Sequence, residues 1–133
     1  MNVVTIKNKA AIQKMREAGR LLALVMREIG PEVKAGVTTF DIDFLIENKM
    51  RDFGLMPECK GYAGYQHASC ISVNDVVVHG VPAKEIILKS GDFVKIDIVG
   101  SYKNYCADMA RYFFIGDVSP EVKKLAAVAQ LIS

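Results

Sequence analysis

The sequence contains no tryptophan, only four prolines, and three cysteines, an odd number with no Cys-x-x-Cys pair. An odd, irregularly spaced set of cysteines argues against a disulfide framework. No apolar run approaches the length that spans a membrane, and residues 1–9 lack the apolar core of a signal peptide. The sequence therefore predicts a cytoplasmic protein with reduced thiols and no membrane partner.

A strong charge of one sign is also missing. The chain has 17 basic and 15 acidic residues, well interspersed, for a net charge of +2. This balance argues against a nucleic-acid partner, which needs a concentrated basic surface. With 133 residues, of which 51% are hydrophobic, the chain is predicted to form one domain with a core of its own.

Two amphipathic helices are predicted in the first part of the chain. Asn8 caps a helix that runs to about Ile29, and Thr38 or Thr39 opens a second helix that Gly54 closes. Each helix is apolar on one side only, so each needs a sheet or another helix beneath it. The expected buried positions are Ile12, Met15, Leu22, Val25, Met26 and Ile29 in the first helix, and Ile42, Leu45, Ile46, Met50 and Phe53 in the second.

The middle of the chain is predicted to be a loop followed by two strands. Residues 61–68 are rich in glycine and aromatic residues, and His67 is expected to be exposed within this loop. Residues 70–73 and 76–82 are predicted to be strands joined by a turn at Asn74-Asp75.

A third helix is predicted near the end of the chain. Ser119 is its N-cap and Pro120 its first residue. No glycine, asparagine or late basic residue ends this helix. A helix that meets the chain end without a stop signal is the basis for expecting a truncated polypeptide.

The stretch that organises the rest is an acidic hairpin over residues 91–116, with Asp97 in one strand and Asp108 in the other. If Lys103-Asn104 is the two-residue loop, Asp108 faces Val99 and lies diagonal to Asp97. If the loop lies one residue earlier, the two acids sit directly opposite each other. Both registers place the carboxylates on one face.

Two like charges so close together repel unless a proton or a cation intervenes. A hard divalent cation with oxygen ligands is one solution. Ordinary ion pairs are the alternative, since Lys95 lies on the same face as Asp97 and Arg111 follows Asp108.

Other residues have both a structural and a functional interpretation. His79 is either a satisfied core histidine or, near a metal, a hydrogen-bond partner for a reacting carbonyl. A small group of apolar and aromatic residues either packs a loop or lines a pocket for an unbranched, even sulfur-containing, side chain. These residues are Cys59, Tyr62, Tyr65 and Cys70.

Taken together, three motifs closely resemble type I methionine aminopeptidase. They are Gly61-Tyr62-x-Gly64-Tyr65, the run Cys70-Ile71-Ser72-Val73-Asn74-Asp75-Val76-Val77-Val78-His79-Gly80-Val81-Pro82, and Gly91-Asp92-x-Val94-x-Ile96-Asp97 with Asp108 after it. The resemblance covers essentially the whole chain. It implies an α+β (α/β) fold that is half of the pita-bread fold, with an antiparallel sheet and helices on one face. Residues 1–133 would be the N-terminal half of the catalytic domain, truncated at the C-terminus.

The resemblance also implies a function, which is removal of the initiator methionine from nascent proteins by a dinuclear metallopeptidase. Two divalent ions (Co²⁺, Mn²⁺, Fe²⁺ or Zn²⁺) would be held by Asp97, which binds one of them, and by Asp108, which bridges both. His79 would be the catalytic histidine that contacts the substrate. Cys59, Tyr62, Tyr65 and Cys70 would line the methionine pocket, and Asn74 and Val76 would offer backbone oxygens to a monovalent cation.

The remaining ligands of that family, a histidine and two glutamates, would lie in a second half that has no counterpart here. Cys106 and Met109 also depart from the family pattern toward its proline-specific relatives, although the segment from His79 to Pro82 argues against them. We therefore expect the chain alone to be inactive and its exposed half-core to self-associate. The alternative is a naturally short, non-catalytic half that serves as a binding or assembly module.

Overall fold

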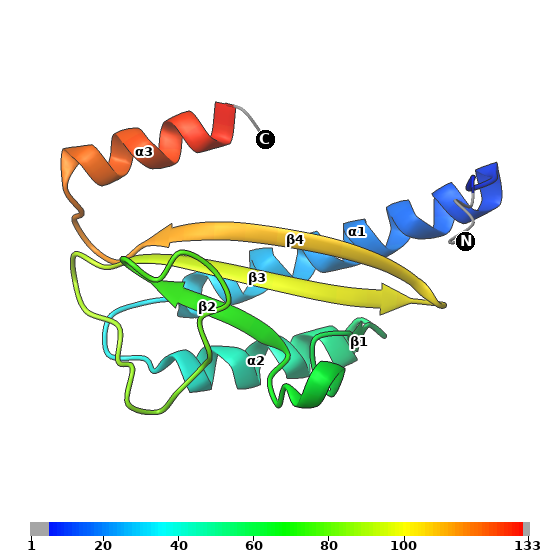
Figure 1. Cartoon of the computed structure of the whole chain (residues 1–133), viewed down its shortest axis with the longest axis horizontal. Helices are drawn as coiled ribbons and strands as arrows, with labels where there is room; N and C mark the ends of the chain where they lie inside the picture. The colour runs from blue at the N-terminus through cyan, green and yellow to red at the C-terminus, as the bar shows by residue number, and fades with distance from the viewer. Residues whose placement is uncertain (1–5, 132–133) are drawn as a thin grey trace.

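The structure is a computed structural model, and it describes residues 6–131. Three helices, two short 3₁₀ turns and four strands follow one another along this part of the chain (Figure 1). In order they are α1 (Lys9–Ile29), a 3₁₀ turn (Gly30–Glu32), α2 (Thr39–Asp52), β1 (Met56–Pro57), a second 3₁₀ turn (Tyr62–Gly64), β2 (Ser69–Val73), β3 (Phe93–Tyr102), β4 (Tyr105–Phe114) and α3 (Pro120–Leu131). The last two residues expected in the third helix, Ile132 and Ser133, lie outside the described residues.

The predicted helix starts are confirmed by their capping contacts. The Asn8 side chain accepts a hydrogen bond of 2.9 Å from the backbone N–H of Ala11. Thr38 Oγ1 accepts from the N–H of Asp41 at 3.0 Å, and its hydroxyl donates to the Asp41 carboxylate at 2.7 Å. These contacts satisfy N–H groups that have no partner within the helix.

The sheet is antiparallel, and β3 is its central strand. β4 pairs with β3 along its whole length, from Phe93↔Phe114 to Tyr102↔Tyr105. On the other edge of β3, β2 pairs with residues 94–98 and β1 with residues 100–101. The hairpin register predicted from a Lys103-Asn104 loop is therefore confirmed, and both loop residues have the positive φ angles, 50° and 66°, that such a tight turn requires.

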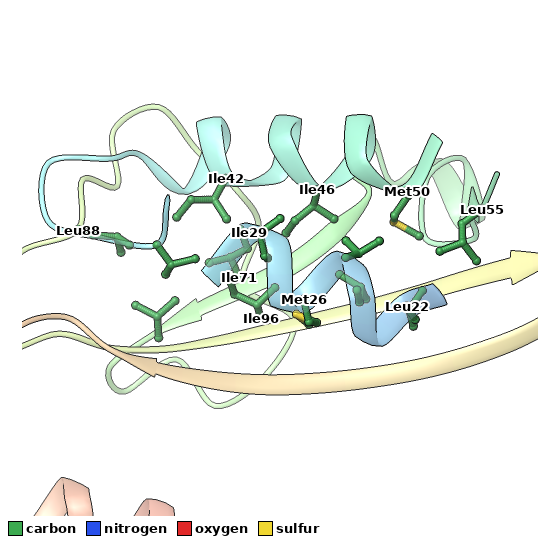
Figure 2. Packing of buried hydrophobic residues seen from close by; sticks show 14 of the residues in the cluster. Leu22, Met26, Ile29, Ile42, Ile46, Met50, Leu55, Ile71, Leu88 and Ile96 are labelled. Atoms are coloured by element: carbon green, nitrogen blue, oxygen red, sulfur yellow. The ribbon is translucent and has the colours of Figure 1, made fainter. Parts of the chain in front are cut away.

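The core lies between one face of this sheet and the helices α1 and α2, whereas α3 stands apart from them (Figure 1). Figure 2 shows Leu22, Met26 and Ile29 of α1 and Ile42, Ile46 and Met50 of α2 converging on the sheet. From the strands come Ile71, Val94, Ile96 and Ile98.

The predicted buried stripe of α1 is wrong in its first two turns. Ile12 and Met15 are 40% and 39% exposed, while Ala11 and Ala18 are buried. Small residues let this part of the helix lie close to β4, since the nearest atom to a Cβ built on Gly19 would be the Cβ of Ala107, at 3.9 Å. A prediction that assigns the largest apolar side chains to the core therefore selects the wrong side of such a helix.

The second predicted strand, over residues 76–82, is also wrong. Its four valines are 44–77% exposed and the segment forms an irregular loop. It meets β2 at Gly80, whose carbonyl accepts from the N–H of Ile71 at 2.8 Å. β-branched residues favour strands only where a neighbouring strand and a buried face exist, and this loop has neither.

None of the helices found within residues 6–131 is both long and apolar enough to cross a bilayer.

Candidate metal and substrate site

The candidate site lies on the sheet face that points away from α1 and α2, which we call the outer face. Val94, Ile96 and Ile98 point into the core, so the alternate residues of β3, Asp97 among them, point the other way. Asp97 pairs with Ala110 and Asp108 pairs with Val99. The two carboxylates therefore share the outer face on adjacent strands, one diagonal step apart.

These two acids are poorly compensated. Burial raises the pKa of Asp97, and the nearby Asp108 carboxylate raises it further, while His79 acts weakly in the opposite direction. In the described part of the chain neither acid is in an ion pair. The ion pairs considered from the sequence, with Lys95 and Arg111, do not form.

The donor chemistry of this pair fits a hard divalent cation, which prefers carboxylate oxygens and would relieve the repulsion between the acids. No group of three or more His, Cys, Asp or Glu side chains placed to hold a metal occurs between residues 6 and 131. Asp97 and Asp108 by themselves therefore do not form a closed coordination shell.

Three of the four predicted pocket residues lie beside these acids. Cys70 is paired with Asp97 across β2 and β3, and its thiol donates to the Tyr65 hydroxyl at 3.6 Å. Burial raises the pKa of the Cys59 thiol, with smaller contributions from Cys70, Asp97 and Asp108, so Cys59 belongs to the same group. Tyr62 does not, because its side chain is 79% exposed on the preceding turn.

His79 occupies a strained corner of the loop after β2. Its φ angle is +57°, which is uncommon for a residue with a side chain. The following residue must be glycine, because a Cβ at Gly80 would lie 2.2 Å from the carbonyl oxygen of Ile71. The close approach of Gly80 to β2 thus holds an exposed histidine next to the outer face.

The backbone oxygens of Asn74 and Val76, the expected cation ligands, converge on one point. However, both already accept hydrogen bonds from the side-chain ammonium of Lys95, at 3.2 Å and 2.5 Å.

Asp43 is a site residue that the sequence analysis missed. It lies on α2 with its side chain only 7% exposed, and it supports the start of β2. Its Oδ1 accepts from the N–H groups of Ala68 and Ser69 at 3.0 and 2.9 Å and from the Ser69 hydroxyl at 2.7 Å. Its other oxygen lies 2.9 Å from Nδ1 of His67. The sequence signal that could have identified Asp43 is its position as an acid next to Ile42 on the apolar stripe of α2.

The expectation that His67 is exposed is therefore wrong. Its side chain is only 18% exposed and makes edge contacts with the rings of Tyr65 and Phe40, at centroid distances of 5.6 and 6.2 Å. The Tyr65 hydroxyl in turn donates to the Ser69 carbonyl at 2.8 Å. Asp43 and His67 thus hold one wall of the candidate pocket in place.

Comparisons with known proteins point to one family. Residues 13–132 match the model of metallopeptidase family M24. The methionine aminopeptidase of Clostridium acetobutylicum is 36% identical over 128 residues, which is 96% of this chain and 51% of that protein. Methionine aminopeptidase 1 of Bacillus subtilis is 35% identical over 128 residues, again 96% of this chain and 51% of the relative. The chain spans about half the length of the curated relatives it matches.

Solved structures agree with this result. The methionine aminopeptidase of Thermotoga maritima superposes with a TM-score of 0.93 at 34% identity, covering 98% of this chain and 52% of that one. An X-Pro aminopeptidase from the same organism is less similar, with a TM-score of 0.76 at 27% identity over 90% of this chain and 32% of that one. The fold is half of the pita-bread fold, as expected from the motifs, and the chain belongs to metallopeptidase family M24.

Proposed function

We propose that this chain is the N-terminal half of a methionine aminopeptidase, an enzyme that removes the initiator methionine from nascent proteins in the cytoplasm. The observation that carries the proposal is the pair Asp97 and Asp108, two acids on adjacent strands of the outer face without ion-pair partners among residues 6–131. Similarity to proteins named methionine aminopeptidase over nearly the whole chain supports the substrate class.

In this proposal Asp97 and Asp108 would supply part of the ligand set for two divalent ions. When bound, such ions polarise the scissile carbonyl and lower the pKa of a water molecule. Mn²⁺, Co²⁺, Fe²⁺ and Zn²⁺ all accept carboxylate ligands, and the two acids alone do not select among them.

The substrate-facing groups follow from the same arrangement. Cys59, Tyr65 and Cys70 offer soft, apolar surface next to the acids, which suits an unbranched thioether side chain. Tyr62 would have to fold over the substrate to complete this pocket, since its ring is exposed. His79 is exposed beside Asp97 and is assigned to hydrogen-bond the substrate near the scissile bond.

We further propose that the chain alone is catalytically inactive, because two carboxylates do not complete a dinuclear site. A second candidate function, a non-catalytic binding or assembly module, is supported by an uncovered groove. A cavity of about 660 Å³ lies between α3 and the outer face, and apolar residues such as Phe93, Tyr112, Val122 and Leu125 line it. A second copy of the chain is the occupant we propose for it.

One experiment tests the catalytic assignment. The purified chain is titrated with Mn²⁺ by calorimetry, and the same samples are assayed for methionine release from a Met-Ala-Ser peptide. We expect weak binding, loss of that binding in Asp97→Asn and Asp108→Asn, and no turnover. Glu85→Gln is the matched control. It removes an exposed acid from the connection between β2 and β3, and it should bind Mn²⁺ like the parent chain.

Two results would contradict the proposal. Mn²⁺ binding that is unchanged in both Asp variants would remove the metal assignment. Two tight sites per monomer, or turnover that Asp97→Asn abolishes, would show that the chain is a complete enzyme and not an inactive half.

A further inference from the structure

The turn after β2 is built to bring two carbonyl oxygens together. Asn74 has a left-handed backbone (φ +53°), and its N–H donates to the Phe93 carbonyl at 2.8 Å. Its side chain is clamped as well, because Oδ1 accepts from the N–H of Phe93 and Nδ2 donates to Asp92, both at 3.0 Å. The turn closes with a 3.1 Å hydrogen bond from the N–H of Val76 to the Val73 carbonyl. The oxygens of Asn74 and Val76 are thereby fixed toward the outer face.

Lys95 reaches this point from β3. Its ammonium donates to the Asn74 oxygen at 3.2 Å and to the Val76 oxygen at 2.5 Å, and it lies 5.6 Å from the centre of the Phe93 ring. Two converging carbonyl dipoles and an aromatic face each favour a positive charge. An ammonium with three donors satisfies both oxygens at once.

A dissolved monovalent cation does not fit here. To bind the same two oxygens it would have to displace the Lys95 ammonium, or sit against a like charge at close range. The ammonium is also tethered to the chain, so its binding does not cost the translational entropy that a free ion loses on binding. The resemblance to aminopeptidases predicted a free cation at Asn74 and Val76, and the Lys95 ammonium lies at the oxygens that would bind it.

We propose that Lys95 is a built-in replacement for a monovalent cation, which makes this turn independent of K⁺ and Na⁺. The turn opens the loop that carries His79, so the ammonium fixes the start of that loop without an ion from solution. The proposal concerns the folded chain itself and stands whether or not the peptidase assignment is correct.

The test measures thermal unfolding in KCl, in NaCl and in tetramethylammonium chloride at equal ionic strength, since tetramethylammonium is too large to enter the turn. The parent chain should unfold at the same temperature in all three salts. Lys95→Ala leaves the two oxygens open, so its midpoint should be lower in tetramethylammonium chloride and rise saturably with KCl or NaCl. We expect that rise to be roughly 3 °C or more for a chain of this size.

Lys124→Ala is the matched control, because it removes an exposed lysine from α3 and should show no difference among the salts. Lys95→Met keeps most of the side-chain length without a hydrogen-bond donor, and it replaces Lys95→Ala if that variant does not fold. A K⁺-specific rise in the parent chain would overturn the proposal. A folded Lys95 variant whose unfolding midpoint is the same in all three salts would also overturn it, because the two oxygens would then bind no cation.

Discussion

Asp43 shows how a single buried acid can shape a site to which it contributes no reacting atom. Its carboxylate collects two buried N–H groups and a hydroxyl at the start of β2, and it binds His67, whose ring contacts Tyr65. A carboxyl group this deeply buried is tolerated because hydrogen bonds surround it. The position of Tyr65 thus depends on an acid in α2, more than 20 residues earlier in the chain.

Replacing Asp43 should therefore be costly. Asp43→Ala leaves the N–H groups of Ala68 and Ser69 buried without partners, and we expect a loss of about 3 kcal/mol in the free energy of unfolding. Asp43→Asn keeps one accepting oxygen and should lose about 1 kcal/mol. Urea denaturation measures both, and Asp52→Asn, at the exposed end of α2, is the control that should stay within about 0.5 kcal/mol of the parent.

Hydrogen exchange separates a local role from a global one. If the acid holds this loop, the amides of Ala68 and Ser69 should exchange faster in Asp43→Ala by more than the global loss explains. Equal acceleration throughout the sheet would mean that Asp43 acts on overall stability alone.

At the level of single elements, α2 is also connected to the loop that follows β1. Glu47 binds Arg51 one turn later at 2.7 Å and Lys60 across the loop at 2.7 Å, with its side chain 13% exposed. The hydrogen bond from Lys60, and then that from Arg51, lowers the pKa of Glu47. The two ion pairs therefore stabilise the charged carboxylate in the folded chain, and they are absent from the unfolded chain.

This contact has a defined pH dependence. Because the pKa of Glu47 is lower in the folded state, its contribution is complete above the unfolded-state pKa and is lost as the pH falls through the folded-state value. Glu47→Gln should thus be less stable than the parent by about 0.5–1 kcal/mol at pH 7, and the difference should disappear in acid. Urea unfolding between pH 7 and pH 3 measures it. A difference of the same size at pH 7 and at pH 3 would show that the contact is not electrostatic.

The packing of α1 and α2 against β3 depends on Gly100, a residue without a side chain. A Cβ at this position would lie 2.6 Å from Leu22 and 2.7 Å from the end of Met50. We expect Gly100→Ala to destabilise the chain by about 1–3 kcal/mol, as an overpacked core does. Gly19→Ala on α1 has room, with its nearest neighbour at 3.9 Å, and should stabilise by about 0.5–1 kcal/mol. Thermal unfolding of both variants tests whether the effects have opposite signs.

Elements with a local signal could be predicted from the sequence. The caps at Asn8 and Thr38 and the hairpin loop at Lys103-Asn104 depend on a few neighbouring residues, and all three are confirmed. Once that loop is set, the shared face of Asp97 and Asp108 follows from strand geometry alone.

Features that depend on distant partners could not be predicted in this way. The valines after Asn74 have strand propensity, but no neighbouring strand pairs with them. The support of His67 by Asp43 joins two segments with no local sign of each other. The ammonium of Lys95 reaches its two carbonyls only because β2 and β3 pair in this register.

At the scale of the whole molecule, the main feature is the open apolar groove between α3 and the outer face. Leu125, Val128 and Leu131 are 65%, 49% and 85% exposed on one helix. Exposed apolar surface of this kind favours association. We expect a dimer or larger assembly at micromolar concentration, with an interface drawn mainly from the C-terminal third.

Light scattering with size-exclusion chromatography measures this directly. Leu125→Lys should shift the chain toward monomer because it places a charge in the groove. Phe44→Lys is the control, since it removes an equally exposed apolar residue, 61% exposed, from α2 on the opposite side of the core. A parent chain that is monomeric at micromolar concentration would contradict the prediction.

The order of the elements along the chain also affects how it folds as it is made. α1 and α2 are complete by Asp52, but the strand that covers their apolar faces, β3, begins at Phe93. At translation rates of about 5–20 residues per second, the helices would leave the ribosome several seconds before their partner strand. During that interval Leu22, Met26, Ile46 and Met50 have no sheet to pack against, so the nascent chain offers chaperones a binding surface that the finished domain no longer displays.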